Sequence, residues 1–361
     1  MQIQHKISAA QFFITMFVSR VVVTIALNAQ YMGGENLLDN TVSYVLAMAV
    51  GLLIALPIWA LHKRHPDLSV GEVAKLDLGR AGRVVPLCYL LYFILVNAAS
   101  LALFVVFLLD TVNPDFSAAF VAAAIVAVAL YGAVRGIETV SRCATCVFVA
   151  LLAGSLLVFG IVAARFQTEN LEPLFYHGWS QTAQGTVLFI ARTSIFADMA
   201  VLLPQVKGRK KLGFACWAGG TALFVCTLLL LLVGCLGRYA YTQNFPVYAL
   251  ASITEVRSMQ RLDAVFIGVW MMGLIIKLAC DIYACRACFS SLTNRKKPRF
   301  AAAAAAALIL ALALWAAASR GLQHILLDTG LLFLCTVATG ALVPLLVLLA
   351  DRVKRRKKGG G

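Results

Sequence analysis

The chain has 361 residues, of which 61% are hydrophobic and only 13% are charged, and its formal net charge is +15. A water-soluble domain carries roughly 25% charged residues, so this composition excludes a soluble globule. The apolar residues also lie in long blocks, which excludes a transmembrane barrel, because barrel strands are short and alternate apolar with polar residues.

Several apolar stretches are long enough to cross a bilayer as helices. A span needs roughly 20 apolar residues, and the stretch from Val84 to Leu109 runs 26 residues without a charge. The first stretch is not a cleaved signal peptide, because it is too long and holds Arg20 half-way along. We therefore predict an all-α membrane protein with about ten transmembrane helices. In chain order, the segments are 7–30, 41–61, 84–109, 116–134, 143–164, 185–206, 212–236, 262–284, 300–319 and 325–350.

The basic residues gather on one side of the predicted membrane. With the N-terminus inside, 23 of the 31 lysines and arginines fall in cytoplasmic segments and 5 in outer segments. An excess of Lys and Arg marks the cytoplasmic side, so we expect an integral protein of the cell membrane with both termini in the cytoplasm. The net charge then reflects contact with lipid headgroups and not a nucleic-acid partner.

The segment count suggests an internal organisation. We expect a single integral membrane domain over residues 1–361, with a first five-helix half at 7–164, a second at 185–350 and a basic cytoplasmic tail at 351–361. An odd number of spans in each half inverts the second half, which is the 5+5 inverted-repeat arrangement of many secondary transporters. The polar segment 62–83 is expected to form a short amphipathic helix on the inner surface.

Arg20 lies within the first apolar segment. It follows Ile7 by 13 residues, or about 20 Å along a helix, which is near the middle of the bilayer. Thr24 lies one helical turn further on, so one side of this helix is polar and must face protein or a cavity. A structural salt bridge to another helix and a contact with a ligand both remain open.

The sixth segment has a polar centre made of Arg192, Thr193, Ser194 and Asp198. In inverted-repeat transporters the opening helices of the two halves are commonly broken and hold the substrate. Asp198 is the acidic partner that the sequence offers at this depth, so one arginine charge is left over, and a carboxylate-bearing solute would satisfy it. The alternative is an Arg20–Asp198 bridge that only joins the two helices.

Lys277 and Asp281 lie four residues apart in the eighth segment, so they can form an ion pair. Asp281 is expected near the inner surface and Lys277 deeper. A buried lysine loses its proton readily, so Asp198, Lys277 and Asp281 are candidates for proton relay or for replacing a coupling cation. A purely structural ion pair is the alternative.

Signals for enzymes and metals are weak. The sequence holds no P-loop, no GxSxG and no HExxH, and its five histidines are scattered, so we predict no enzyme, no cofactor and no metal. Two CxxC pairs, Cys143/Cys146 and Cys285/Cys288, lie near predicted cytoplasmic helix ends. Four thiolates bind zinc where such ends meet, whereas small residues that pack helices are the alternative interpretation.

Five short motifs, each weak alone, follow one another along nearly the whole chain. They are Ile7-Ser8 with Gln11-Phe12-Phe13; Tyr131-Gly132 with Arg135-Gly136-Ile137-Glu138 and Ser141-Arg142; Asn170 to Phe175; Asp198 with Leu202-Leu203-Pro204 and the basic run Lys207 to Lys211; and Arg261-Leu262-Asp263 with Trp270 and Lys277. In order and spacing, the motifs resemble those of the endospore germination permeases, the B subunits of spore germinant receptors.

The resemblance implies the fold of amino acid/polyamine/organocation permeases, with helices one and six interrupted at a central site. It implies a sensor of small nutrients such as amino acids in the spore inner membrane, working with an A-type membrane subunit and a C-type lipoprotein. The chain departs from the family at helix one. A Gly-x-Gly-like break is usual there, whereas this chain has Arg20-Val21-Val22-Val23-Thr24. The arginine either fills the ligand space or binds the ligand's carboxylate.

Our first prediction is therefore a permease-like germinant-receptor subunit that binds a small solute between helices one, three, six and eight. Tyr92 and Asn97 on helix three are expected to supply polar contacts. One alternative is an autonomous proton-coupled amino acid transporter. Another is a subunit that only holds its partners together.

Overall fold

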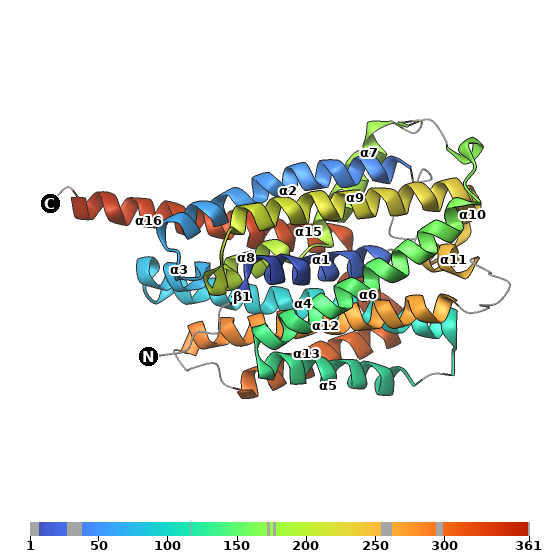
Figure 1. Cartoon of the computed structure of the whole chain (residues 1–361). Coiled ribbons are helices and arrows are strands. Elements are labelled where there is room, and N and C mark those ends of the chain that lie inside the picture. The colour runs from blue at the N-terminus through green and yellow to red at the C-terminus, as the bar shows by residue number, and fades with distance from the viewer. Residues whose placement is uncertain are drawn as a thin grey trace.

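The computed structural model describes residues 7–26, 38–115, 117–171, 174–175, 178–253, 262–293 and 299–359. Within these ranges the chain is a bundle of long helices that run roughly side by side, and β1 and the end of α16 lie toward the same end (Figure 1). Nine helical stretches of the described residues are long and apolar enough to cross a membrane, and α1 is a shorter apolar helix. Each of the ten predicted segments contains a helix.

The first five segments form single long helices. A capping box at Ser8 and Gln11 starts the first of them, since each side chain accepts a hydrogen bond from the other residue's backbone N–H. Residues 27–30 of the first predicted segment lie outside the described ranges. The helices are α1 (Ala9–Ile25), α2 (Asp39–Arg64), α4 (Val84–Phe107), α5 (Ala118–Arg135) and α6 (Ile137–Ala163).

The last five segments are less regular, because the sixth and the tenth are broken. The sixth consists of α7 (Trp179–Ala191) and α8 (Ile195–Leu202). The tenth consists of α15 (Thr329–Val337), a π-helical turn (Ala338–Leu342) and α16 (Val343–Gly359). The remaining helices are α9 (Lys210–Leu236), α12 (Leu262–Thr293) and α13 (Arg299–Ala318), with short α3 (Val70–Leu78), α10 (Tyr239–Thr242), α11 (Pro246–Ser252) and α14 (Arg320–Leu326) between them.

Several helices extend well beyond the apolar segments that predicted them, and α6 and α12 are two examples. Helix α6 starts at Ile137 and not at residue 143, because Gly136 alone connects it to α5 and its polar first turns are helical. Helix α12 continues to Thr293, nine residues past the predicted end at 284. In both cases polar turns extend the helix, and hydropathy alone does not detect them.

A parallel sheet of two short strands, each two residues long, joins the start of α1 to the segment that follows α8. Strand β1 (Ile7–Ser8) pairs with β2 (Val206–Lys207), with Ile7 opposite Val206 and Ser8 opposite Lys207. Near the centre of the bundle, α12 packs against α1, α4, α5, α6 and α13. The first and sixth segments are thus tied together at one end and lie close to α12 in the interior.

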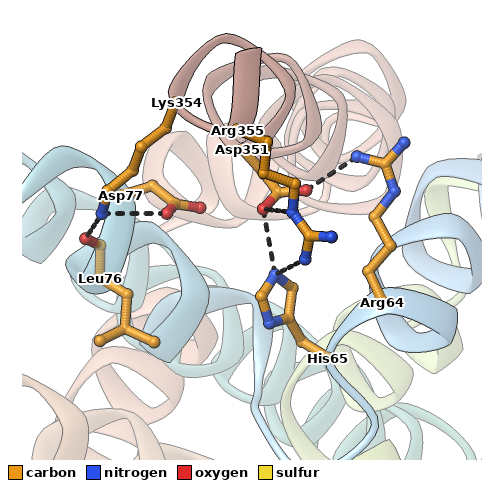
Figure 2. A network of polar contacts seen from close by, with 7 residues as sticks. All are labelled: Arg64, His65, Leu76, Asp77, Asp351, Lys354 and Arg355. Atoms are coloured by element: carbon orange, nitrogen blue, oxygen red, sulfur yellow. Dashed lines mark hydrogen bonds and ion pairs between the residues drawn. The ribbon is translucent and has the colours of Figure 1, made fainter. Parts of the chain in front are cut away.

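Ion pairs fasten α16 to α2 (Figure 2). Asp351 is 2% exposed and is surrounded by three basic side chains. Its carboxylate lies 2.8 Å from Arg64 Nη1, 3.1 Å from His65 Nε2 and 2.9 Å from Arg355 Nε. Every oxygen of this buried carboxylate therefore has at least one donor.

The same helix also contacts α3, the predicted short amphipathic helix. Lys354 Nζ lies 3.3 Å from a carboxylate oxygen of Asp77 and donates to the carbonyl oxygen of Leu76 (Figure 2). The buried face of α3, which includes Val70 and Val73, packs against the protein. The prediction of a helix in segment 62–83 is confirmed, although its apolar face covers other helices of the chain.

Candidate solute-binding site

The interruption between α7 and α8 frees two backbone carbonyls in the interior. Arg192, Thr193 and Ser194 are not helical, and α8 begins at Ile195. Arg20 Nη1 donates to the Arg192 carbonyl at 3.0 Å, and the Tyr92 hydroxyl donates to the Thr193 carbonyl at 2.8 Å. Broken backbone at membrane depth needs such partners. The predicted interruption of the sixth helix is confirmed, and residues of helices one and three stabilise it.

Helix one, by contrast, is continuous through Arg20. Its buried hydroxyls donate to carbonyls of their own helix, as Ser19 does to Thr15 at 2.9 Å and Thr24 to Arg20 at 2.9 Å. The interruption that the resemblance implies for helix one is absent from the described part of that helix, Ala9 to Ile25. A run of β-branched valines favours an ordered helix and not an exposed unwound backbone.

Arg20 is 3% exposed and lies among aromatic rings. Its Nε donates to the Tyr44 hydroxyl at 3.1 Å, and its guanidinium carbon lies 5.0 Å from the Tyr44 ring centroid and 6.0 Å from that of Phe189. Its Nη2 has no hydrogen-bond partner in the described structure. The Arg20–Asp198 bridge, one of the two alternatives, is not among the ion pairs of the described residues, where a tyrosine hydroxyl and a backbone carbonyl accept hydrogen bonds from the guanidinium.

Arg192 reaches the second broken helix. Its Nη2 donates to the carbonyl of Leu327 at 3.2 Å, directly before the Asp328 cap of α15. From the same helix, the Thr336 hydroxyl donates to the Ala191 carbonyl at 3.4 Å. The break in the sixth segment therefore contacts α15 at two places, through the Leu327 carbonyl just before this helix and through the Thr336 hydroxyl within it.

A second set of buried charges lies on α12. Lys277 Nζ is 2.7 Å from Asp281 Oδ2 and 3.3 Å from Asn97 Oδ1, and the Asn97 amide donates to Asp281 Oδ2 at 2.9 Å. The predicted Lys277–Asp281 pair is thus present. Asp281, expected near the inner surface, is 0% exposed within the described structure, and α12 continues for 12 residues beyond it.

Asp198 is also 0% exposed, and neither of its carboxylate oxygens has a hydrogen-bond partner among the described residues. One of its oxygens, the Cys280 sulfur and an oxygen of Asp281 all lie within 4.8 Å of one another. We had expected no metal-ligating cluster, and the structure brings these three ligand types together. The Lys277 ammonium beside Asp281 supplies a built-in positive charge at the same place.

Five of the predicted site residues line one small cavity: Arg20, Arg192, Thr193, Ser194 and Lys277. Its volume is about 10 Å³, the space of about one water molecule. The other predicted residues lie around it and do not line it. They are Thr24, Tyr92, Asn97, Asp198 and Asp281.

Sequence reasoning missed the aromatic residues at the site. Tyr44 is a hydroxyl-bearing residue inside an apolar segment and is 0% exposed, which is a signal that could have been used. Phe189 gives no such signal, because only its position relative to Arg20 distinguishes it from other core phenylalanines.

The two CxxC pairs do not form a common site. Cys143 and Cys146 are exposed on α6, whereas Cys285 and Cys288 are buried on α12. Among the described residues, none of these thiols belongs to a group of three or more potential metal ligands. The structure therefore gives no support to the zinc interpretation for the part of the chain it describes.

Comparisons with known proteins agree with this geometry. Residues 6–320 match the family model described as spore germination protein. The chain belongs to the spore germination protein family. It is 24% identical to spore germination protein KB of Bacillus subtilis strain 168 over 302 residues, which cover 81% of this chain and 80% of that protein. It is 27% identical over 256 residues to the putative spore germination protein YfkT of the same organism, covering 67% of each.

The fold of this family member is that of LeuT-like transporters. A sodium-coupled sialic acid symporter, solved in a substrate-bound outward-open state, superposes with a TM-score of 0.66 over 93% of this chain and 78% of the symporter, at 12% identity. The predicted fold class and the resemblance to germination permeases are thus confirmed. Members of this family are permease-like membrane proteins and not enzymes.

Proposed function

We propose that this protein is the permease-like B subunit of a nutrient germinant receptor and that it binds a small carboxylate-bearing solute, such as an amino acid, beside Arg20 and Arg192. The observation that carries the proposal is an excess of buried positive charge around the cavity. Arg20, Arg192 and Lys277 are buried cations around one cavity, and Asp198 and Asp281 are the buried carboxylates beside it. Among the described residues around the cavity, three formal charges are positive and two are negative, and an anionic group would neutralise the excess positive charge.

The partners and the cell location follow from the same proposal. An A-type membrane subunit and a C-type lipoprotein would complete the receptor in the spore inner membrane. The 23-to-5 distribution of basic residues supports cytoplasmic termini. Reporter fusions after Lys211 should read cytoplasmic, and one near Asn244 should read external. An external signal after Lys211 would overturn the orientation.

The cavity is far smaller than an amino acid, so binding requires helix movement. The broken α7–α8 pair is suited to this, because its freed carbonyls are held by side chains, Arg20 and Tyr92, that are able to exchange partners. A solute carboxylate would then replace the Arg192 carbonyl as the acceptor for Arg20. This exchange would link solute binding to the arrangement of helices one and six.

An autonomous proton-coupled amino acid transporter is the second candidate. It is favoured by the Asp198–Lys277–Asp281 group, in which a lysine occupies the position of a cation next to two carboxylates. Uptake of a labelled amino acid by the purified protein alone in liposomes, driven by a pH gradient, would support the transporter. Absence of uptake together with solute binding would support the receptor subunit.

The test of the binding site exchanges arginine for lysine. Arg192→Lys and Arg20→Lys keep the charge but lose the bidentate donor pair. We expect the midpoint of the germination dose–response, normalised to membrane abundance, to rise about tenfold or more, as for loss of a charged hydrogen bond.

The matched control is Arg142→Lys, whose side chain is 71% exposed on α6 and pairs with Glu138. It should leave the midpoint unchanged. Wild type and both site variants should respond equally to solutes whose carboxylate is replaced by an amide. An unchanged midpoint in Arg20→Lys and in Arg192→Lys would remove both arginines from the site.

A further inference from the structure

An open groove of about 530 Å³ lies between the start of α1, the start of α9 and α6. It shares no lining residue with the central cavity. Its walls are almost entirely apolar and include Phe13, Phe17, Phe148 and Trp217. The groove is therefore separate from the central cavity, and its apolar walls are suited to a hydrocarbon chain.

Two glycines on α9 shape this groove. Gly213 and Gly220 are seven residues apart, so they lie on one face of the helix, two turns from each other. A Cβ at Gly213 would lie 2.4 Å from the Phe13 ring, whereas one at Gly220 would lie 3.6 Å from the Phe17 ring. Gly213 thus permits close contact of α9 with α1, and Gly220 leaves unfilled space.

The mouth of the groove is positively charged. Lys207 and Arg209 line it and are exposed, and neither forms a salt bridge within the described ranges. Arg209 is also the N-cap of α9 and makes no side-chain capping bond. The positive end of the α9 dipole therefore lies beside the same two cations.

We propose that this groove binds an anionic phospholipid. One acyl chain would lie along Phe13, Phe17 and Gly220, and the phosphate would sit between Lys207, Arg209 and the start of α9. Charge complementarity selects this occupant. A zwitterionic lipid would not use the two cations fully, and a water-soluble anion would leave the apolar walls uncovered.

The first test removes the charges at the mouth. Binding of dioleoyl phosphatidylglycerol to the purified full chain in detergent is measured by native mass spectrometry or by fluorescent-lipid titration. The double variant Lys207→Gln/Arg209→Gln should bind it about tenfold or more weakly than wild type, the effect of losing two headgroup contacts. Arg80→Gln/Arg83→Gln removes two exposed charges outside the groove and should bind like wild type.

The second test fills the groove. Gly220→Leu should weaken phosphatidylglycerol binding several-fold, whereas its neighbour Gly219→Leu should not, because a Cβ at Gly219 meets nothing within 4 Å and Gly219 does not line the groove. Both variants gain the same side chain and lose the same helix-weakening glycine. Their thermal unfolding separates an effect on lipid binding from one on folding.

Several outcomes would overturn the proposal. One is equal lipid affinity in both members of each variant pair. Another is equal affinity for dioleoyl phosphatidylcholine, which would show a site for any lipid. Competition by glycerol 3-phosphate at the same concentration as the lipid would show a soluble-anion site. If Gly220→Leu left lipid binding intact but abolished co-purification of an A-type subunit, the groove would hold a partner helix instead.

Discussion

Two of the groups of buried charges among the described residues are built differently. At the end of the bundle, the Asp351 carboxylate has three basic neighbours between 2.8 and 3.1 Å away. In the interior, Asp198 has no hydrogen-bond partner in the described structure, and Arg20 Nη2 also lacks one. Buried polar groups are normally satisfied, so an unsatisfied pair near a broken helix calls for an explanation other than stability.

The two groups differ in whether their hydrogen bonds and ion pairs are complete in the folded chain. The Asp351 network joins α16 to α2 by interactions that are complete in the folded chain. In the interior group, atoms of Asp198 and Arg20 have no hydrogen-bond partner among the described residues, and buried charges cost several kcal/mol in hydrocarbon surroundings. Under the function proposed above, an anionic solute that binds and leaves would complete this group.

The largest effect is expected in the interior ion pair. Asp281→Asn leaves the Lys277 ammonium, which is 1% exposed, without its counter-charge. We expect a loss of about 3–5 kcal/mol of stability, measured as unfolding of the purified protein in detergent. The double variant Lys277→Met/Asp281→Leu should recover much of this loss, because it removes both buried charges together.

An exposed pair of the same spacing is the control for that experiment. Glu138 and Arg142 are also four residues apart and lie at 2.6 Å, but their side chains are 39% and 71% exposed. Glu138→Gln should cost less than about 1 kcal/mol. Equal costs for Asp281→Asn and Glu138→Gln would contradict the view that burial decides the energetics. A double variant no more stable than Asp281→Asn would show that the two charges are not coupled.

A smaller effect is expected at the end of the bundle. Asp351→Asn keeps the shape of the side chain but removes the charge that three basic groups share. We expect a loss of about 1–3 kcal/mol and faster protease cleavage in α16. Lys354→Ala, whose side chain is 39% exposed, should cost less than about 1 kcal/mol. Unchanged cleavage of α16 in Asp351→Asn would mean that other contacts hold this helix.

The sequence was sufficient to predict the spans and the burial of three cations within them. Long apolar blocks define the helices, and counting residues along a span places Arg20, Arg192 and Lys277 in the interior, where they line one cavity. Depth along a helix is a one-dimensional quantity, and a sequence provides it directly. The break at Arg192–Ser194 was likewise expected from its position in the second half.

The hydrogen-bond partners of these buried side chains could not be predicted from the sequence. They depend on how each helix is rotated about its axis and on which backbone carbonyls a break releases. Arg20 therefore contacts Tyr44 and the Arg192 carbonyl and not Asp198. The end of the helix that carries Asp281 also differs from the prediction, since hydropathy predicts an end at 284 and α12 continues to Thr293.

The short two-stranded sheet of β1 and β2 has a consequence for the affinity of the central cavity for a solute. It ties the start of α1 to the end of α8, so a solute that reached the central cavity between these two helices from that end would have to wait for the sheet to separate. A pairing of Ile7 with Val206 and Ser8 with Lys207 holds few backbone hydrogen bonds, each worth about 1 kcal/mol net. The apparent dissociation constant would then equal the intrinsic one divided by the fraction of time that the sheet is open, so a mostly closed sheet would weaken binding.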